Sequence, residues 1–213
     1  MLHVERSEVF NFEGAVRGMR NPLNSWSKSD SKWENGQYIV GEEDYGLMIK
    51  LCKAGSDHRK FMRQIMVSLD ITAPFYWWKE FDTYKVGTVA NSCSTMHKLT
   101  YKEFELSDFS HEKLKSRMGE SFESLDCLIM LIDFLNDKRE EYLKTNDKSV
   151  WEEIIQLLPT SYNQKRTVTL NYEVLRNIYH ARKNHKLDEW HVLCDWIKTL
   201  PYSDLITMEF KGD

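Results

Sequence analysis

The sequence has few residues that break regular structure and no large excess of charge of either sign. Its 213 residues include only 9 Gly and 4 Pro, which excludes collagen-like and low-complexity chains. The formal net charge is −4, from 29 Lys and Arg against 33 Asp and Glu, so general binding to nucleic acid, which needs many exposed cations, is not expected. Because 41% of the residues are hydrophobic, we expect one folded domain over residues 1–213.

Several other features are missing, and each absence removes a class of protein. The sequence contains no run of about 18 apolar residues, so we expect no membrane span and a cytoplasmic protein. It contains no glycine-rich nucleotide loop, no nucleophile elbow and no paired-histidine zinc motif, and we expect no metal site. No CxxC pair occurs among the cysteines, which we interpret as reduced thiols: Cys52, Cys93, Cys127 and Cys194.

Hydrophobic periodicity predicts regular elements in the first half of the chain. From Glu42, apolar residues recur at helical spacing over about a dozen residues, and Gly55 is placed to end this helix. Apolar and polar residues then alternate over Gln64–Ile71, which predicts a half-buried strand. The aromatic residues of Phe75–Tyr84 are spaced as in a short helix. The first forty residues show no such pattern, so we expect them to be irregular.

The second half is predominantly helical by the same criterion. Apolar residues between 125 and 135 line one face of a long helix, and Ser110 is expected to cap a helix that starts at His111. A brief strand is expected at Thr167–Leu170. The predicted class is therefore α+β with helices dominant. Further helices are predicted near residues 150–158, 175–179 and 187–197.

The small number of clear strands is itself informative. One or two strands do not form a stable sheet, so the sheet needs additional members. Either further strands lie at Leu2–Glu8 and Glu103–Leu106, or another subunit completes the sheet.

Two features carry candidate chemistry. The segment Val86–Ser94 is small and polar, which is typical of a loop that lets a ligand approach the backbone closely. Two basic pairs, Lys165-Arg166 and Arg182-Lys183, could converge on a phosphate, since guanidinium groups bind phosphate oxygens in pairs. The alternative is that both pairs are solvated surface charges, as charged clusters usually are.

From Glu42 to Phe104 the chain resembles the flavin-dependent thymidylate synthases. The shared order is an acid-capped helix, Gly55 and His58, the strand at Gln64–Ile71, Ala73-Pro74, a tryptophan-bearing helix and a loop that ends in Lys98–Phe104. The second half adds Leu158-Pro159 and then Asn171, Asn177 and Arg182 at the family's intervals. The resemblance covers roughly Glu42 to Pro201.

The family's signature is the part that differs most. It reads Arg-His-Arg, seven residues and Ser; here Tyr84-Lys85-Val86 stands in place of the triplet, and Ser94 keeps the interval. Asn91 is retained, whereas Ser92, Met96 and His97 replace the signature's Glu, Arg and Tyr. Because charge-assisted hydrogen bonds are worth ~1.5–3 kcal/mol each, the resemblance is that of a divergent member with weakened flavin binding.

The resemblance implies a homotetramer in which helices pack on a small, mainly antiparallel sheet and active sites lie between subunits. It implies reductive methylation of dUMP to dTMP, with FAD as cofactor and NADPH and methylenetetrahydrofolate as co-substrates, or a closely derived modification of a pyrimidine nucleotide. No catalytic residue is assigned. The implied cofactor-binding residues are His58, Lys85, Asn91, Asn171 and Asn177, and the implied substrate-binding residues are Ser94, Lys165, Arg166 and Arg182.

Two other interpretations stay open at this point. The same tetrameric scaffold without flavin chemistry would be a nucleotide- or partner-binding module, and Ser94 and Arg182 are compatible with either function. A purely structural interpretation treats Trp77, Trp78 and Phe81 as core residues and the 86–94 segment as a connection.

Overall fold

The computed structural model describes residues 1–94, 99–117 and 121–209. Three residues of the sequence pattern discussed above, Met96, His97 and Lys98, lie outside the described residues. In the described part of the chain, no helix combines the length and apolar character that crossing a membrane requires.

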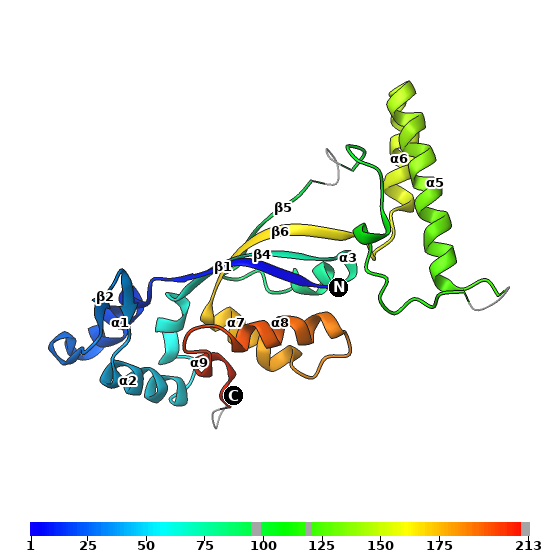
Figure 1. Ribbon diagram of the computed structural model, residues 1–213. Helices are drawn as coiled ribbons and strands as arrows, with labels where there is room; N and C mark the ends of the chain where they lie inside the picture. The colour runs from blue at the N-terminus through cyan, green and yellow to red at the C-terminus, as the bar shows by residue number, and fades with distance from the viewer. Residues whose placement is uncertain (95–98, 118–120, 210–213) are drawn as a thin grey trace. The chain divides into compact units, whose positions relative to one another are not determined.

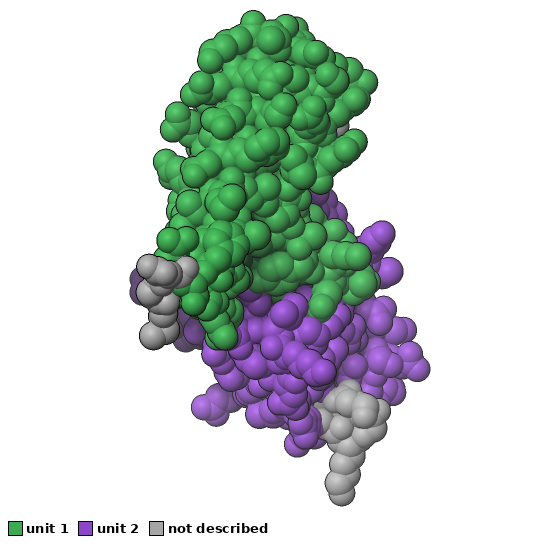
Figure 2. Space-filling model, turned by 90° about the vertical axis from the view of Figure 1, so that its right-hand side faces the viewer, with its two compact units in different colours: residues 1–3, 72–83, 91–166 green, residues 4–71, 84–90, 167–213 purple. Residues whose placement is uncertain are grey.

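The chain forms two compact units, each assembled from three separate segments (Figure 2). Unit 1 comprises Met1–His3, Thr72–Thr83 and Asn91–Arg166, and unit 2 comprises Val4–Ile71, Tyr84–Ala90 and Thr167–Asp213. The assignment of residues 1–213 to a single domain stays a prediction.

A four-stranded sheet has the order β1-β4-β6-β5 (Figure 1). These strands are β1 (His3–Phe10), β4 (Met66–Pro74), β6 (Asn163–Asn171) and β5 (Val89–Ser92). The strands predicted at Gln64–Ile71 and Thr167–Leu170 are confirmed, with β6 longer than expected. Strand β1 agrees with the alternative that placed a further strand at Leu2–Glu8. The α+β class, with helices and a small antiparallel sheet, is also confirmed.

Strand β5 corrects the prediction that Val86–Ser94 is entirely a loop. All four of its residues are exposed, so no face of the strand is buried and no alternation of apolar and polar residues marks it in the sequence. The backbone continues to pair just beyond β5, where Cys93 N–H donates to the carbonyl oxygen of Lys165 at 2.9 Å.

Unit 2 contains most of the shorter helices. The predicted helix at Glu42 is α2 (Glu42–Lys53), and Gly55 follows its end with φ +100, a left-handed conformation that glycine adopts without strain. The predicted C-terminal helices are also present. They are α7 (Tyr172–Arg182) and α8 (Asp188–Lys198), followed by α9 (Asp204–Thr207).

The expectation that the first forty residues are irregular is wrong. They form β1, then α1 (Phe12–Arg20) and the antiparallel hairpin of β2 (Lys32–Glu34) and β3 (Gln37–Ile39). Helix α1 is only nine residues long, and the two hairpin strands have three residues each, mostly exposed. Elements this short offer too few periodic positions for the sequence pattern to indicate them.

Unit 1 contains α3 (Phe75–Phe81), α5 (Ser124–Thr145) and α6 (Lys148–Leu157). Helices α5 and α6 lie side by side (Figure 1). The prediction that Trp77, Trp78 and Phe81 are core residues is confirmed, since all three are buried. The long helix predicted from the apolar residues between 125 and 135 is likewise confirmed. A core cluster joins this helix to α6 and to the preceding segment, and it includes Leu128, Ile132, Leu135, Ile154, Phe104 and Phe109.

Two local predictions in unit 1 are wrong. No helix starts at His111, because the Ser110 hydroxyl donates to Asn163 Oδ1 at 2.9 Å instead of capping a following helix. No strand forms at Glu103–Leu106 either. The amide side chain of Asn136 satisfies both the N–H and the carbonyl of Phe104, at 2.8 and 3.0 Å, so this backbone needs no strand partner.

Candidate functional site

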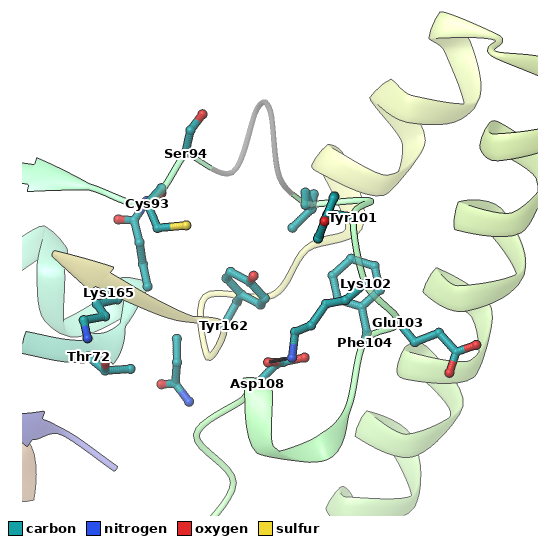
Figure 3. Close-up of a pocket in the computed structure, with 13 residues that line it drawn as sticks. Thr72, Cys93, Ser94, Tyr101, Lys102, Glu103, Phe104, Asp108, Tyr162 and Lys165 are labelled. Carbon is teal, nitrogen blue, oxygen red and sulfur yellow. Dashed lines mark hydrogen bonds and ion pairs between the residues drawn. The ribbon is translucent and has the colours of Figure 1, made fainter.

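A cavity of about 500 Å³ lies in unit 1 beside the ends of β5 and β6 (Figure 3). A cavity of this size can hold a small ligand. Its walls combine aromatic rings with charged and hydroxyl groups. The side chains that matter for its chemistry are Cys93, Ser94, Lys102, Asp108, Tyr162 and Lys165.

Gln164 fixes the wall formed by β6 and the residue after β5. Its side-chain Nε2 donates to the carbonyl oxygen of Cys93 at 2.9 Å, and its Oε1 accepts a bond from Arg166 Nε at 2.9 Å. Its backbone carbonyl accepts a bond from the indole of Trp78, also at 2.9 Å. These bonds hold the cavity wall in place before any ligand arrives.

Lys165 and Ser94, both predicted to bind substrate, line this cavity. Figure 3 shows Cys93 and Lys165 on one side and Lys102 and Asp108 on the other, with Tyr162 between them. Lys102 Nζ lies 2.7 Å from Asp108 Oδ1 in a surface ion pair. Lys165 and Lys102 are thus two lysines that line this cavity.

Tyr162 supplies a neutral hydrogen-bond donor. Its phenol has a pKa raised to about 12, mainly because the side chain is buried and to a smaller extent because Asp108 and Cys93 are near. The hydroxyl consequently keeps its proton at neutral pH and can donate to an oxygen of a ligand. Together with Lys165 and Ser94, it could bind a polar or anionic molecule.

The other two predicted site residues of unit 1 do not line the cavity. Arg166 is held by Asp82, whose Oδ1 lies 2.7 Å from Nη1, and its guanidinium stacks over Trp78 at 4.2 Å from the ring centroid. Asn91 lies in β5 and is exposed. These contacts hold the guanidinium of Arg166 between Asp82 and Trp78, and its role in binding substrate stays a prediction.

In unit 2, the loop of residues 84–90 contacts both ends of α7. Near the end of the helix, Arg182 Nε donates to the hydroxyl of Tyr84 at 2.9 Å. At its start, a Cβ on Gly87 would lie only 2.9 Å from Asn171 Nδ2, and Gly87 has φ +79. Glycine is required at this position because the backbone approaches Asn171 closely in a left-handed conformation.

Four of the predicted residues belong to this loop and to α7 with its N-cap. Lys85 is exposed in the loop, and Asn177 is exposed on α7. Asn171 is buried and caps α7, its Oδ1 accepting a bond from Val174 N–H at 3.1 Å. The guanidinium of Arg182 also lies over the ring of Trp190, 4.7 Å from the centroid. Since Lys165 and Arg182 belong to different units, their joint grip on a phosphate stays a prediction.

His58 lies apart from those four residues. It is exposed at the start of a short 3-10 helix, η3 (Arg59–Arg63), and lines another cavity of unit 2, of about 1080 Å³, between α1, α2 and η3. The other predicted cofactor-binding residues do not line this cavity. The role of His58 in binding a flavin therefore stays a prediction.

Sequence reasoning missed a buried ion pair next to these residues. Arg59 Nε donates to both carboxylate oxygens of Glu173, at 3.3 and 3.2 Å, and so ties η3 to the first turn of α7. It also missed Gln164 and Tyr162. The partners of the ion pair are 114 positions apart, and no local pattern connects residues at that separation. In the described part of the chain, no group of three or more His, Cys, Asp or Glu side chains is placed to hold a metal ion.

Comparison with solved structures identifies the fold. Over 97% of its length the chain aligns with 98% of the flavin-dependent thymidylate synthase ThyX from Helicobacter pylori, complexed with FAD and dUMP, with a TM-score of 0.69 and 17% identity. The chain has the ThyX fold. It also covers 94% of a UMP/dUMP methylase, PolB from Streptomyces cacaoi bound with 5-Br UMP, with a TM-score of 0.64 and 14% identity.

The ThyX fold is thus confirmed, whereas the roles of individual residues stay predictions at these identities. No protein-family model and no curated protein matches the sequence.

Proposed function

We propose that this protein binds dUMP or a related pyrimidine nucleoside monophosphate in the cavity of unit 1 and methylates its C5 position. The observation that carries the proposal is the placement of Lys165, Ser94 and Tyr162 around one cavity of a chain with the ThyX fold. Both similar proteins named above were crystallised with uridine nucleotides, which supports this substrate class.

Each of these side chains has a defined part in the proposed reaction. Lys165 binds the phosphate as a cation, and Ser94 donates a further hydrogen bond to it. Tyr162 keeps its proton and donates to a carbonyl oxygen of the pyrimidine ring, where it stabilises negative charge that develops during attack by the ring. Gln164 fixes the cavity wall that contains Lys165 and Cys93, because its side chain donates to the carbonyl oxygen of Cys93.

The loop of residues 84–90 and helix α7 form the proposed flavin site. Lys85 is an exposed cation, and the buried hydroxyl of Thr88 in the same loop has no hydrogen-bond partner among the described residues. We propose that Lys85, Asn171 and Asn177 hold FAD, with Asn91 and His58 contributing across a subunit boundary. FAD, reduced by NADPH, supplies the hydride of reductive methylation, and methylenetetrahydrofolate supplies the carbon.

The proposal includes a homotetramer. Helix α5 exposes Ile129, Met130 and Phe134 although all three are apolar. Apolar side chains grouped on one helix indicate a surface that another protein surface covers. The mass in solution, measured by sedimentation, tests this part, and a folded monomer at micromolar concentration would contradict it.

The central experiment is titration of the purified protein with dUMP, with deoxyuridine as the control that lacks only the phosphate. We expect dUMP to bind and deoxyuridine to bind far more weakly, because Lys165 is proposed to contact the phosphate. Incubation with FAD, NADPH and methylenetetrahydrofolate should then convert dUMP to dTMP, detected by mass spectrometry. Failure of dUMP to bind would remove the proposed substrate class.

A second candidate function is a nucleotide-binding module without flavin chemistry. The observation that favours it is the position of the signature triplet, where Tyr84-Lys85-Val86 provides one cation only. In that case the protein would bind dUMP, remain colourless with added FAD and form no dTMP.

A further inference from the structure

A second ligand-sized cavity in unit 2 has several aromatic rings in its lining. Its volume is about 770 Å³, and it lies between the β2–β3 hairpin, the start of α1 and the turn after α8. It shares no residue with the cavity of unit 1. Five aromatic side chains line it: Phe10, Phe12, Trp33, Tyr38 and Tyr202.

Contacts within unit 2 hold the aromatic walls in place. Trp33 and Tyr38 are paired across the hairpin, with ring centroids 5.5 Å apart. Phe12 and Tyr202 meet edge to face at 5.2 Å. The Tyr202 hydroxyl accepts a bond from Val40 N–H at 3.1 Å, which ties the turn to the end of the hairpin. A site held in this way needs little ordering when a ligand binds.

Tyr202 also has an unusual backbone conformation. Its φ is +52, in the left-handed region that residues with large side chains rarely adopt. Such a conformation costs free energy, and strained residues of this kind cluster at ligand sites. In this conformation the ring of Tyr202 contacts Phe12, and the residue lines the cavity.

Charge indicates which ligand the cavity would accept. Glu13 is the only ionisable acid or base among the described residues that line it, tyrosines aside. Its carboxylate accepts a bond from the indole N–H of Trp33 at 3.3 Å, so the anion lies beside an aromatic ring. Arg17 lies one turn further along α1 and does not line the cavity. An anionic nucleotide would find no lysine or arginine among the described residues that line this cavity.

We propose that this aromatic cavity binds an alkylated ammonium group. The faces of aromatic rings attract organic cations, and a nearby carboxylate neutralises the charge of the cation. Phe10 and Trp33 are exposed, so their rings are accessible to a ligand. The ammonium group can belong to a small molecule or to a methylated lysine side chain, and the chemistry of recognition is the same. The proposal is independent of the function proposed for unit 1.

The test uses the full-length protein and two probes of the same shape, one of which is cationic and the other neutral. Calorimetric titration with choline is compared with titration with its neutral analogue, the alcohol in which carbon replaces the ammonium nitrogen. We expect choline to bind about tenfold more tightly, in keeping with the strength of partly desolvated cation–π contacts. Equal affinities for the two probes would overturn the proposal.

Three variants locate the binding. Trp33→Ala and Glu13→Gln should each weaken choline binding by at least about fivefold. Trp26→Ala is the matched control, because Trp26 is an exposed tryptophan of the same unit that does not line the cavity, and it should leave the affinity unchanged. Trp33 is 59% exposed, so its truncation should preserve the fold, and the dUMP titration of this variant should match that of wild type. Choline binding that survives Trp33→Ala would show that the cavity is not the site.

Two further measurements are needed. The first distinguishes a protein ligand from a small-molecule ligand, and the second tests whether a second copy of the chain occupies the cavity. A peptide with trimethyllysine that binds more tightly than choline would support a protein ligand, and the reverse order would support a small-molecule ligand. If sedimentation shows that Trp33→Ala dissociates an oligomer, a second copy of the chain occupies the cavity and the proposal is wrong.

Discussion

Charged side chains have different functions in the interior of unit 2 and around the cavity of unit 1. In unit 2, Arg20 and Asp44 form an ion pair that is almost completely buried. In unit 1, the ion pair of Lys102 and Asp108 is at the surface, and the side chain of Lys102 is 59% exposed. Burying charges costs hydration free energy that only a matched partner offsets, whereas an exposed ion pair contributes little to stability. Burial therefore decides on which ion pair the fold depends.

The largest expected effect is the loss of the buried pair in unit 2. Arg20→Met removes the guanidinium and leaves the carboxylate of Asp44 buried without its cation. We expect the free energy of unfolding to fall by about 3–5 kcal/mol, measured by urea denaturation. Lys144→Met is the control, because Lys144 pairs with Glu140 at the surface, and it should cost about 0.5 kcal/mol or less. Similar losses in both variants would contradict the comparison.

The same pair should make stability depend on pH. Burial by itself would raise the pKa of Asp44, but hydrogen bonds from Ser29, Ser31 and Arg20 outweigh this effect and the pKa is lowered. A lowered folded-state pKa gives stability that is fully present above the unfolded pKa of about 4 and is lost as pH falls through the folded value.

Unfolding of wild type and of Asp44→Asn, measured from neutral pH down to acid, checks this expectation. The difference between the two proteins should shrink as pH falls below about 4. A difference that stays constant would mean that Asp44 does not titrate in this way.

The next effect concerns the cavity of unit 1. Lys165→Ala should weaken dUMP binding by about 2 kcal/mol, roughly thirtyfold, because a charge-assisted hydrogen bond to the phosphate is lost. Calorimetric titration measures the change. Lys102→Ala is the matched control, since Lys102 also lines the cavity but is not proposed to bind the phosphate, and we expect a smaller loss. Equal losses in the two variants would show that the cavity does not distinguish its two lysines.

The smallest difference between a variant and its control tests whether unit 2 also has a closely fitted ligand-binding loop. Gly87→Ala places a Cβ 2.9 Å from Asn171, whereas Gly36→Ala at the same φ of +79 meets no atom within 4 Å. Both variants should lose about 1–2 kcal/mol of stability from the left-handed conformation alone. We expect Gly87→Ala to lose about 1 kcal/mol more, and to weaken FAD binding, because Asn171 must move. Identical stabilities and FAD affinities would exclude a functional contact at this position.

Local sequence patterns predicted the elements that have a strong period. Helix α2 and strand β4 were expected at nearly their observed bounds, because each buries one periodic face against the core. Strand β5 and the hairpin of β2 and β3 were missed because they are short and largely exposed. Without a buried face, a strand leaves no alternation to detect.

The roles of the candidate site residues stay predictions, but their placement shows what the sequence left open. Lys165 and Ser94 line one cavity, whereas Arg166, grouped with Lys165 in the sequence, contacts Asp82 and Trp78. Adjacent residues of a strand point to opposite sides, and a basic pair in the sequence does not indicate which member lines a cavity.

The sequence by itself determined the α+β class, the positions of the long helices and strand β4, and the absence of a basic excess, because all of these depend on local pattern or composition. Only the tertiary structure decided that Arg59 meets Glu173, that Gln164 supports Cys93, and that Glu13 faces an aromatic wall. The physical reason is that such contacts join segments far apart in the chain. Their energies depend on burial and geometry that exist only after the segments pack.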